Sequence, residues 1–149
     1  MRSLFVSLLT VPFLGGCKLP TDSREILRVD ISISPATVRG GDTAVVAVRL
    51  VNPTLAATTV AGSSTCRLAF DVLDKNGLRV GGSPARGMCT MDLLHVVLAG
   101  GQSDAQVFHW AAVQAAGQPL PPGSYTIVGR SLWVNGLQSA PRAFAILTR

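Results

Sequence analysis

The sequence has little charge and no hydrophobic run long enough to cross a membrane. Charged residues make up 14% of the 149 positions and hydrophobic residues 48%, a balance that excludes a disordered chain. The apolar run at residues 4–14 is much shorter than the roughly 20 residues that a membrane-spanning helix needs. The net charge is +5, but the arginines are scattered and form no basic stripe. We therefore expect neither a membrane-spanning helix nor a nucleic-acid partner.

The residues that catalysis and metal binding require are also scarce. The only histidines are His95 and His109; we expect His95 to be partly buried, and alternation places His109 opposite Phe108 and Trp110. No serine lies in a Gly-x-Ser-x-Gly elbow, and no adjacent pair of acids suits glycoside hydrolysis. Zinc would need four ligands, and no glycine-rich phosphate loop precedes a helix. We therefore predict no enzyme, no metal and no cofactor, with a hydrolase as the weaker alternative.

The three cysteines divide into one near the amino terminus and two inside the chain. Cys66 and Cys89 lie 23 positions apart. In an exported protein, such a pair can form a disulfide that closes a loop and stabilises the fold. We predict this disulfide, and two free buried thiols are the alternative.

The first 16 residues have the organisation of an export signal, with Arg2 ahead of the apolar run at residues 4–14. The next motif, Leu14-Gly15-Gly16-Cys17, resembles the lipobox of bacterial lipoproteins. This resemblance implies cleavage before Cys17, a thioether lipid on its sulfur and an acylated new amino terminus. An ordinary cleaved signal followed by a chance cysteine is the alternative.

The same resemblance predicts the location of the mature protein. Several acyl chains on Cys17 would anchor the chain stably, so we expect an extracytoplasmic, membrane-anchored lipoprotein. Lys18 follows the cysteine, which by resemblance favours the outer membrane if the cell is diderm. Residues 17–25 are polar and contain Pro20, so we interpret them as a tether, and residues 26–149 as a single domain.

The domain consists of short strand-like runs. Residues 26–34 alternate apolar and polar side chains, the period of a half-buried strand, and Asn76-Gly77 is a strong hairpin signal. Strands are expected at residues 26–34, 43–51, 57–61, 66–73, 78–80, 93–98, 105–113, 124–134 and 142–147. No window has a helical period with caps. We predict an all-β fold, an immunoglobulin-like β-sandwich of about eight short antiparallel strands, with a closed barrel as the alternative.

Part of the chain resembles the BsuPI-type intracellular proteinase inhibitor domain. The features that carry the resemblance are Phe108-x-Trp110, Gly117-Gln118-Pro119, Leu120-Pro121-Pro122-Gly123-Ser124-Tyr125-Thr126 and the Phe70-Asp71-Val72-Leu73 run that leads to Asn76-Gly77. The resemblance implies an immunoglobulin-like sandwich and an inhibitory activity toward a proteinase.

Together these features predict a lipid-anchored extracytoplasmic binding module. Its partners would be the membrane, through the lipid on Cys17, and another envelope or secreted protein, with a protease as one candidate. The alternative is an adaptor or accessory protein of an envelope complex without inhibitory activity. Candidate partner contacts are Pro121 and Pro122 in a proline-glycine turn, Arg86 in the loop at residues 81–88, and Trp133 near a loop tip.

Overall fold

The computed structural model describes residues 26–83 and 89–148. The predicted signal, the tether, the lipidation site at Cys17 and the candidate contact Arg86 lie outside these residues. Within the described part of the chain, no helix is long and apolar enough to cross a membrane.

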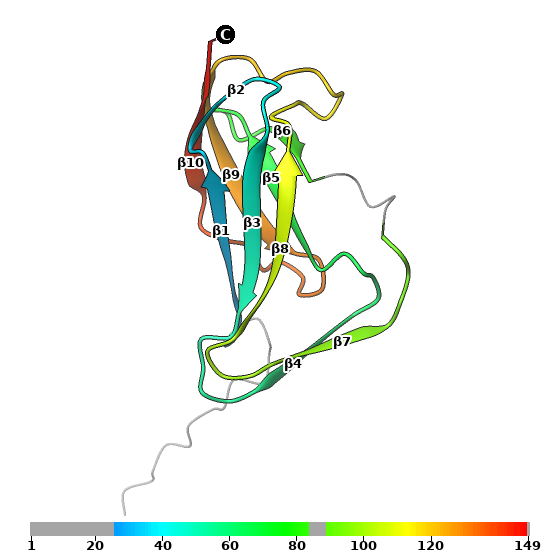
Figure 1. Ribbon diagram of the computed structural model, residues 1–149. Helices are drawn as coiled ribbons and strands as arrows, with labels where there is room; N and C mark the ends of the chain where they lie inside the picture. Colours follow the sequence, from blue (N-terminus) through cyan, green and yellow to red (C-terminus); the bar gives the residue numbers. More distant parts are fainter. Residues whose placement is uncertain (1–25, 84–88, 149) are drawn as a thin grey trace, which may run out of the picture.

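The described residues form ten strands (Figure 1). They are β1 (Arg28–Ser34), β2 (Thr37–Arg39), β3 (Ala44–Val51), β4 (Thr58–Gly62), β5 (Leu68–Leu73), β6 (Arg79–Gly82), β7 (Leu94–Leu98), β8 (Ser103–Trp110), β9 (Gly123–Ser131) and β10 (Arg142–Leu147). The predicted hairpin between β5 and β6 is present, and Gly77 in its turn takes a φ of 78°.

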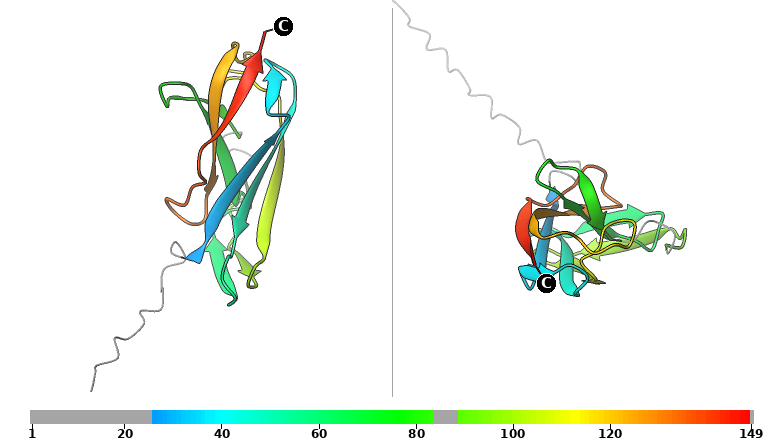
Figure 2. Two further views of the ribbon diagram at one scale, coloured as in Figure 1. Left: turned by 90° about the vertical axis from the view of Figure 1, so that its left-hand side faces the viewer. Right: turned by 90° about the horizontal axis from the view of Figure 1, so that it is seen from above.

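Two sheets form the body of the molecule. One has the strand order β1-β3-β8 and the other β2-β10-β9-β5-β6, and the views in Figure 2 show them as two facing layers. The fold is an immunoglobulin-like β-sandwich, as predicted. One detail differs, because no strand was predicted at residues 37–39, where β2 pairs in parallel with β10. A three-residue strand is too short to leave a period-two pattern.

The core lies between these sheets because each strand turns alternate residues inward. Phe70 is completely buried at its centre, with ring centroids 5.2 Å from Phe108 and 5.9 Å from Trp110, both in edge-to-face geometry. Tyr125 packs against Phe144 nearby, with centroids 5.8 Å apart. Trp110 and Tyr125 are therefore core residues.

The third sheet pairs only β4 with β7 and lies across one end of the sandwich (Figure 1). We call residues 53–62 and 91–99 the arm. Val60 and Leu98 are 4% and 3% exposed and belong to the main core, so the inner face of the arm covers the end of the sandwich. The buried side chain of Asn52 fixes the start of the arm, because its amide donates to the carbonyl oxygens of Ala56 at 2.7 Å and Leu98 at 3.0 Å.

Candidate binding site

The structure confirms the predicted disulfide between Cys66 and Cys89, whose Cα atoms are 5.4 Å apart. Cys66 lies between β4 and β5, and Cys89 precedes β7, so the bridge joins the two segments that connect the arm to the sandwich. Beside it, the Thr65 amide donates to the Thr90 carbonyl at 3.1 Å, and the Thr90 amide donates to the Thr65 hydroxyl at 3.0 Å. This disulfide therefore has a structural role in holding the arm.

Trp133 is half-buried and is not the exposed anchor that its position near a turn predicted. Its indole N–H donates to the Ser64 carbonyl at 2.8 Å. Its ring lies directly over Gly62, where any side chain would overlap it. Trp133 thus joins the sandwich to the arm. The sequence did not reveal this because the partners are about 70 positions away.

Pro121 and Pro122 are exposed, in the segment between β8 and β9. The Tyr125 hydroxyl donates to the Pro121 carbonyl at 2.8 Å, the arrangement known as a tyrosine corner. Leu120 is 2% exposed and ties the segment to the core. Burial, and secondarily the nearby carboxylate of Asp74, raise the pKa of Tyr125 above its ordinary value of 10.0. This braced turn lies at the end of the sandwich opposite the arm (Figure 1).

The two histidines lie on different sheets and both are exposed. His109 lies on the outer face of β8, as the alternation with Phe108 and Trp110 predicted. His95 was expected to be partly buried, but its neighbours Leu94 and Val96 take the inner face of β7, which leaves His95 on the outer face. In the part of the chain that the structure describes, no group of three or more His, Cys, Asp or Glu residues is placed to hold a metal.

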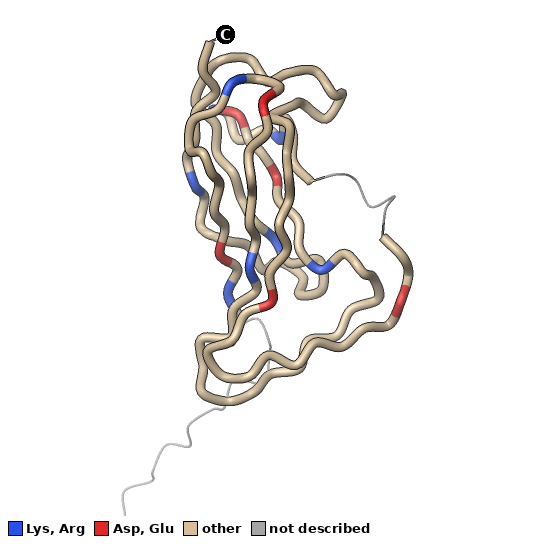
Figure 3. Tube along the Cα trace, in the orientation of Figure 1, with Lys and Arg blue, Asp and Glu red and all other residues tan. Residues whose placement is uncertain are grey.

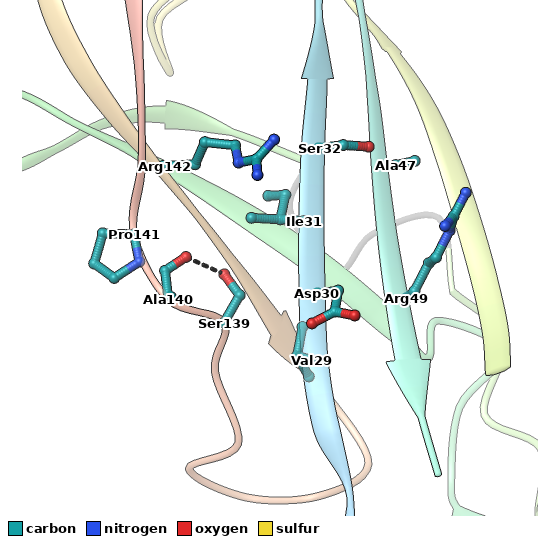
Figure 4. A pocket seen from close by; sticks show the side chains of 10 residues that line it. All are labelled: Val29, Asp30, Ile31, Ser32, Ala47, Arg49, Ser139, Ala140, Pro141 and Arg142. Atoms are coloured by element: carbon teal, nitrogen blue, oxygen red, sulfur yellow. Dashed lines mark hydrogen bonds between the residues drawn. The ribbon is translucent and has the colours of Figure 1, made fainter. Parts of the chain in front are cut away.

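A groove of about 470 Å³ runs along β1 (Figure 4). Its lining comes from β1, from β3 and from the segment that enters β10, and comprises Val29, Asp30, Ile31, Ser32, Ala47, Arg49, Ser139, Ala140, Pro141 and Arg142. The volume falls within the range of roughly 300–1,000 Å³ that is typical of ligand sites. The sequence did not predict this groove, because the strand pattern does not show the order of strands in a sheet.

The groove has a basic character. Arg49 and Arg142 extend from either side of β1, and neither forms a salt bridge with another described residue. The one acid in the lining, Asp30, lies 3.3 Å from the Arg28 guanidinium. On the far side, the Ser139 hydroxyl accepts from the Gly129 amide at 2.9 Å and fixes the segment against β9. The groove therefore offers two unpaired guanidinium groups to a ligand.

No family model matches the chain, and neither does any curated protein. The resemblance to the BsuPI-type domain therefore stays a prediction. Among solved structures, the chain is similar to the CARDB domain of the PF1109 protein from Pyrococcus furiosus, which was determined in complex with di-metal ions. The identity is 15% and the TM-score 0.48, over 83% of this chain and 94% of that one.

Two further solved structures are longer than this chain. The alkylpurine DNA glycosylase AlkC of Pseudomonas fluorescens is 14% identical, with a TM-score of 0.48, over 82% of this chain and 30% of the glycosylase. The sporulation control protein Spo0M of Bacillus subtilis is 12% identical, with a TM-score of 0.46, over 83% of this chain and 50% of Spo0M. Likenesses this remote carry no argument about activity or ligands.

Proposed function

We propose that this protein is a lipid-anchored extracytoplasmic binding module whose groove along β1 receives an extended segment of another envelope or secreted protein. It acts by binding, as an adaptor or accessory protein. The observation that carries the proposal is the combination of an unpaired strand edge with two unpaired arginines in one groove.

The first support is the backbone of β1. All seven residues of β1 pair with β3 on one side, and among the described strands none pairs with its other side. An unpaired edge presents a row of N–H and C=O groups, and an extended peptide can satisfy these groups by adding a strand. The groove lies along this edge, so it leaves room for such a segment.

The second support is charge. The guanidinium groups of Arg49 and Arg142 stay charged at any physiological pH and recognise carboxylates through paired N–H donors. A segment with acidic side chains therefore fits the groove best. The backbone bonds would supply affinity, and the two arginines would select the sequence and register of the segment.

The experiment compares charge-reversed variants of the full-length protein in its own envelope. We expect Arg49→Glu with Arg142→Glu to reduce recovery of the partner at least tenfold, which corresponds to about 1.4 kcal/mol of binding free energy. Arg39→Glu, an exposed arginine on β2 and outside the groove, is the matched control and should leave recovery unchanged. Equal recovery with both variants would show that the groove does not bind the partner.

Inhibition of a protease is the second candidate function, and the braced turn at Pro121 and Pro122 favours it. Protease inhibitors present a rigid exposed segment to the active site, and rigidity reduces the entropy lost on binding. A titration of secreted and envelope serine proteases with the protein tests this candidate. Stoichiometric inhibition that is lost in Pro121→Gly with Pro122→Gly would support it, and unchanged protease activity across the panel would reject it.

A further inference from the structure

We propose that the outer face of the arm docks on the lipid surface that holds the acyl chains of Cys17, so that the protein is attached at two points. This inference rests on the proposed lipid anchor. The occupant that the arm accepts is the interfacial region of the bilayer, where acyl chains meet headgroups.

The arm exposes an unusual amount of apolar side chain. Of the eight large hydrophobic residues that are exposed in the described part of the chain, four belong to the arm. Leu55 is 102% exposed, Met91 85%, Leu93 82% and Val97 64%. Concentrated exposure of this kind marks an interaction surface, because isolated exposed hydrophobic residues are normally scattered.

The arm carries a single charged residue, Asp92, whose carboxylate accepts from the Thr90 hydroxyl at 2.6 Å. Residues 50–66 and 93–103 contain no Asp, Glu, Lys or Arg, and Figure 3 shows the arm as uncharged chain apart from one acidic position shortly before β7. A docking face for a protein partner usually has a polar and charged rim that adds specificity. A face with this little charge suits a lipid interface, where each buried charge would be costly.

The paired residues of β4 and β7 divide between an inner face and an outer face of the arm. Val60 pairs with Val96, and this pair faces the sandwich core. On the opposite face Thr59 pairs with Val97, and Ala61 pairs with His95. The outward-facing side chains of these pairs therefore include no Asp, Glu, Lys or Arg, and the packing of the sandwich uses only the inner face.

The position of the arm agrees with the proposed anchor. β1 begins at the end of the sandwich that the arm covers, whereas the carboxyl terminus lies at the other end (Figures 1 and 2). Leu27, the buried residue before β1, follows Cys17 by ten positions. Ten residues span at most about 35 Å when fully extended. A lipid on Cys17 therefore keeps the arm end of the sandwich close to the bilayer.

The geometry also limits the depth of docking. β4 and β7 pair only with each other among the described strands, so each has an unpaired backbone edge. Unpaired backbone groups are not tolerated in the hydrocarbon interior. The strands must therefore lie along the interface, with side chains such as Leu93 and Val97 inserted. This orientation directs the Pro121–Pro122 turn away from the membrane.

The test measures contact with lipid at single positions of the full-length lipidated protein. Leu55→Cys and Leu93→Cys place a polarity-sensitive fluorophore on the arm. Leu78→Cys is the matched control, because Leu78 is 64% exposed in the β5–β6 hairpin at the opposite end (Figure 1). With Cys17 acylated and Cys66 bridged to Cys89, the introduced thiol is the one to react. The labelled proteins are reconstituted in phosphatidylethanolamine–phosphatidylglycerol vesicles with lipids brominated near the headgroup.

If the arm inserts in the interface, we expect the fluorophores at positions 55 and 93 to be quenched at least about threefold more than the one at Leu78. Equal, weak quenching at all three positions in vesicle-bound protein would overturn the docking and leave the anchor intact. A blue shift at Leu93 that grows with protein concentration without quenching would overturn it in favour of a second copy of the chain. Protein that does not bind vesicles at all would overturn the anchor itself, and the docking with it.

Discussion

The sandwich and the arm use the same strand periodicity for different purposes. In the sandwich, alternate residues such as Phe70 and Ile127 are completely buried, and the opposite face carries charge, as where Asp71 lies 2.7 Å from Arg79 and 3.0 Å from Arg130. In β7 of the arm, both faces are apolar or uncharged. The inner face of β7 packs on the sandwich core, and its outer face, with His95 and Val97, has no cover within the described residues. The outer face of the arm is therefore the surface for which we propose a second contact.

The largest expected effect is on the free energy of unfolding, because the core of the sandwich is closely packed and the outer face of the arm is exposed. Phe70→Ala should lower the free energy of unfolding by about 3–5 kcal/mol because it leaves a cavity in the centre of the core. Leu93→Ala removes a side chain that is 82% exposed. This variant should change the free energy of unfolding by less than about 0.5 kcal/mol. Urea unfolding of both variants checks the contrast. A large loss from Leu93→Ala would mean that the arm is packed more tightly than its exposure indicates.

The disulfide tests how far the arm depends on its connections. Cys66→Ala with Cys89→Ala should reduce the free energy of unfolding by about 3 kcal/mol in the chain-entropy account of loop closure. The effect should be uneven, with hydrogen exchange accelerating more in β4 and β7 than in β9. Exchange that accelerates equally in all three strands would show that the bridge stabilises the whole fold without favouring the arm.

Trp133→Phe tests the contact between the two regions in isolation. The variant keeps a ring over Gly62 and removes the indole N–H that donates to Ser64, so we expect a loss of about 1 kcal/mol. Faster hydrogen exchange in β4, with β9 unchanged, is the expected pattern. Unchanged exchange in β4 would mean that the disulfide and Asn52 hold the arm without this bond.

The smallest expected effect is a pH-dependent change in stability from Tyr125, at the end of the sandwich opposite the arm. Tyr125 binds its proton more tightly in the folded state, because burial and Asp74 raise its pKa above 10.0. Its contribution to stability is therefore complete below pH 10 and is lost as the pH rises through the raised pKa. Tyr125→Phe should lack this loss in alkaline unfolding experiments. Because Tyr125 is the only tyrosine, ultraviolet absorbance titrates it directly, and an unshifted titration would contradict the account.

Much of the sandwich could be predicted from local pattern. The period of two in β1 and the Asn76-Gly77 turn predict the positions of the strands, and the burial of β1 follows the same alternation. The edge position of β1 could not be predicted, since strand order results from contacts between distant residues. β2 was missed because its three residues are held by β10, more than 100 positions later.

The candidate site was less predictable than the fold. The groove is lined by both Arg49 and Arg142. These residues are nearly 100 positions apart in the sequence, and no local motif links them. Trp133 attracted a functional interpretation because tryptophan near a turn often contacts a partner. The structure shows that its ring serves an internal contact. The apolar run at residues 93–98 was visible as a strand, but only the pairing with β4 reveals that one of its faces has no cover within the described fold.

Cys17 decides whether the protein is a lipid-anchored binding module. Wild-type and Cys17→Ser proteins are expressed in a bacterium with lipoprotein processing, the membranes are washed with salt, and the intact masses are measured. We predict that wild-type protein stays in the membrane and carries the mass of a diacylglyceryl group and an amide-linked acyl chain on a chain that begins at Cys17. Cys17→Ser should appear in the soluble fraction. A soluble wild-type protein without acyl mass, or a Cys17→Ser variant that stays tightly bound, would contradict the account.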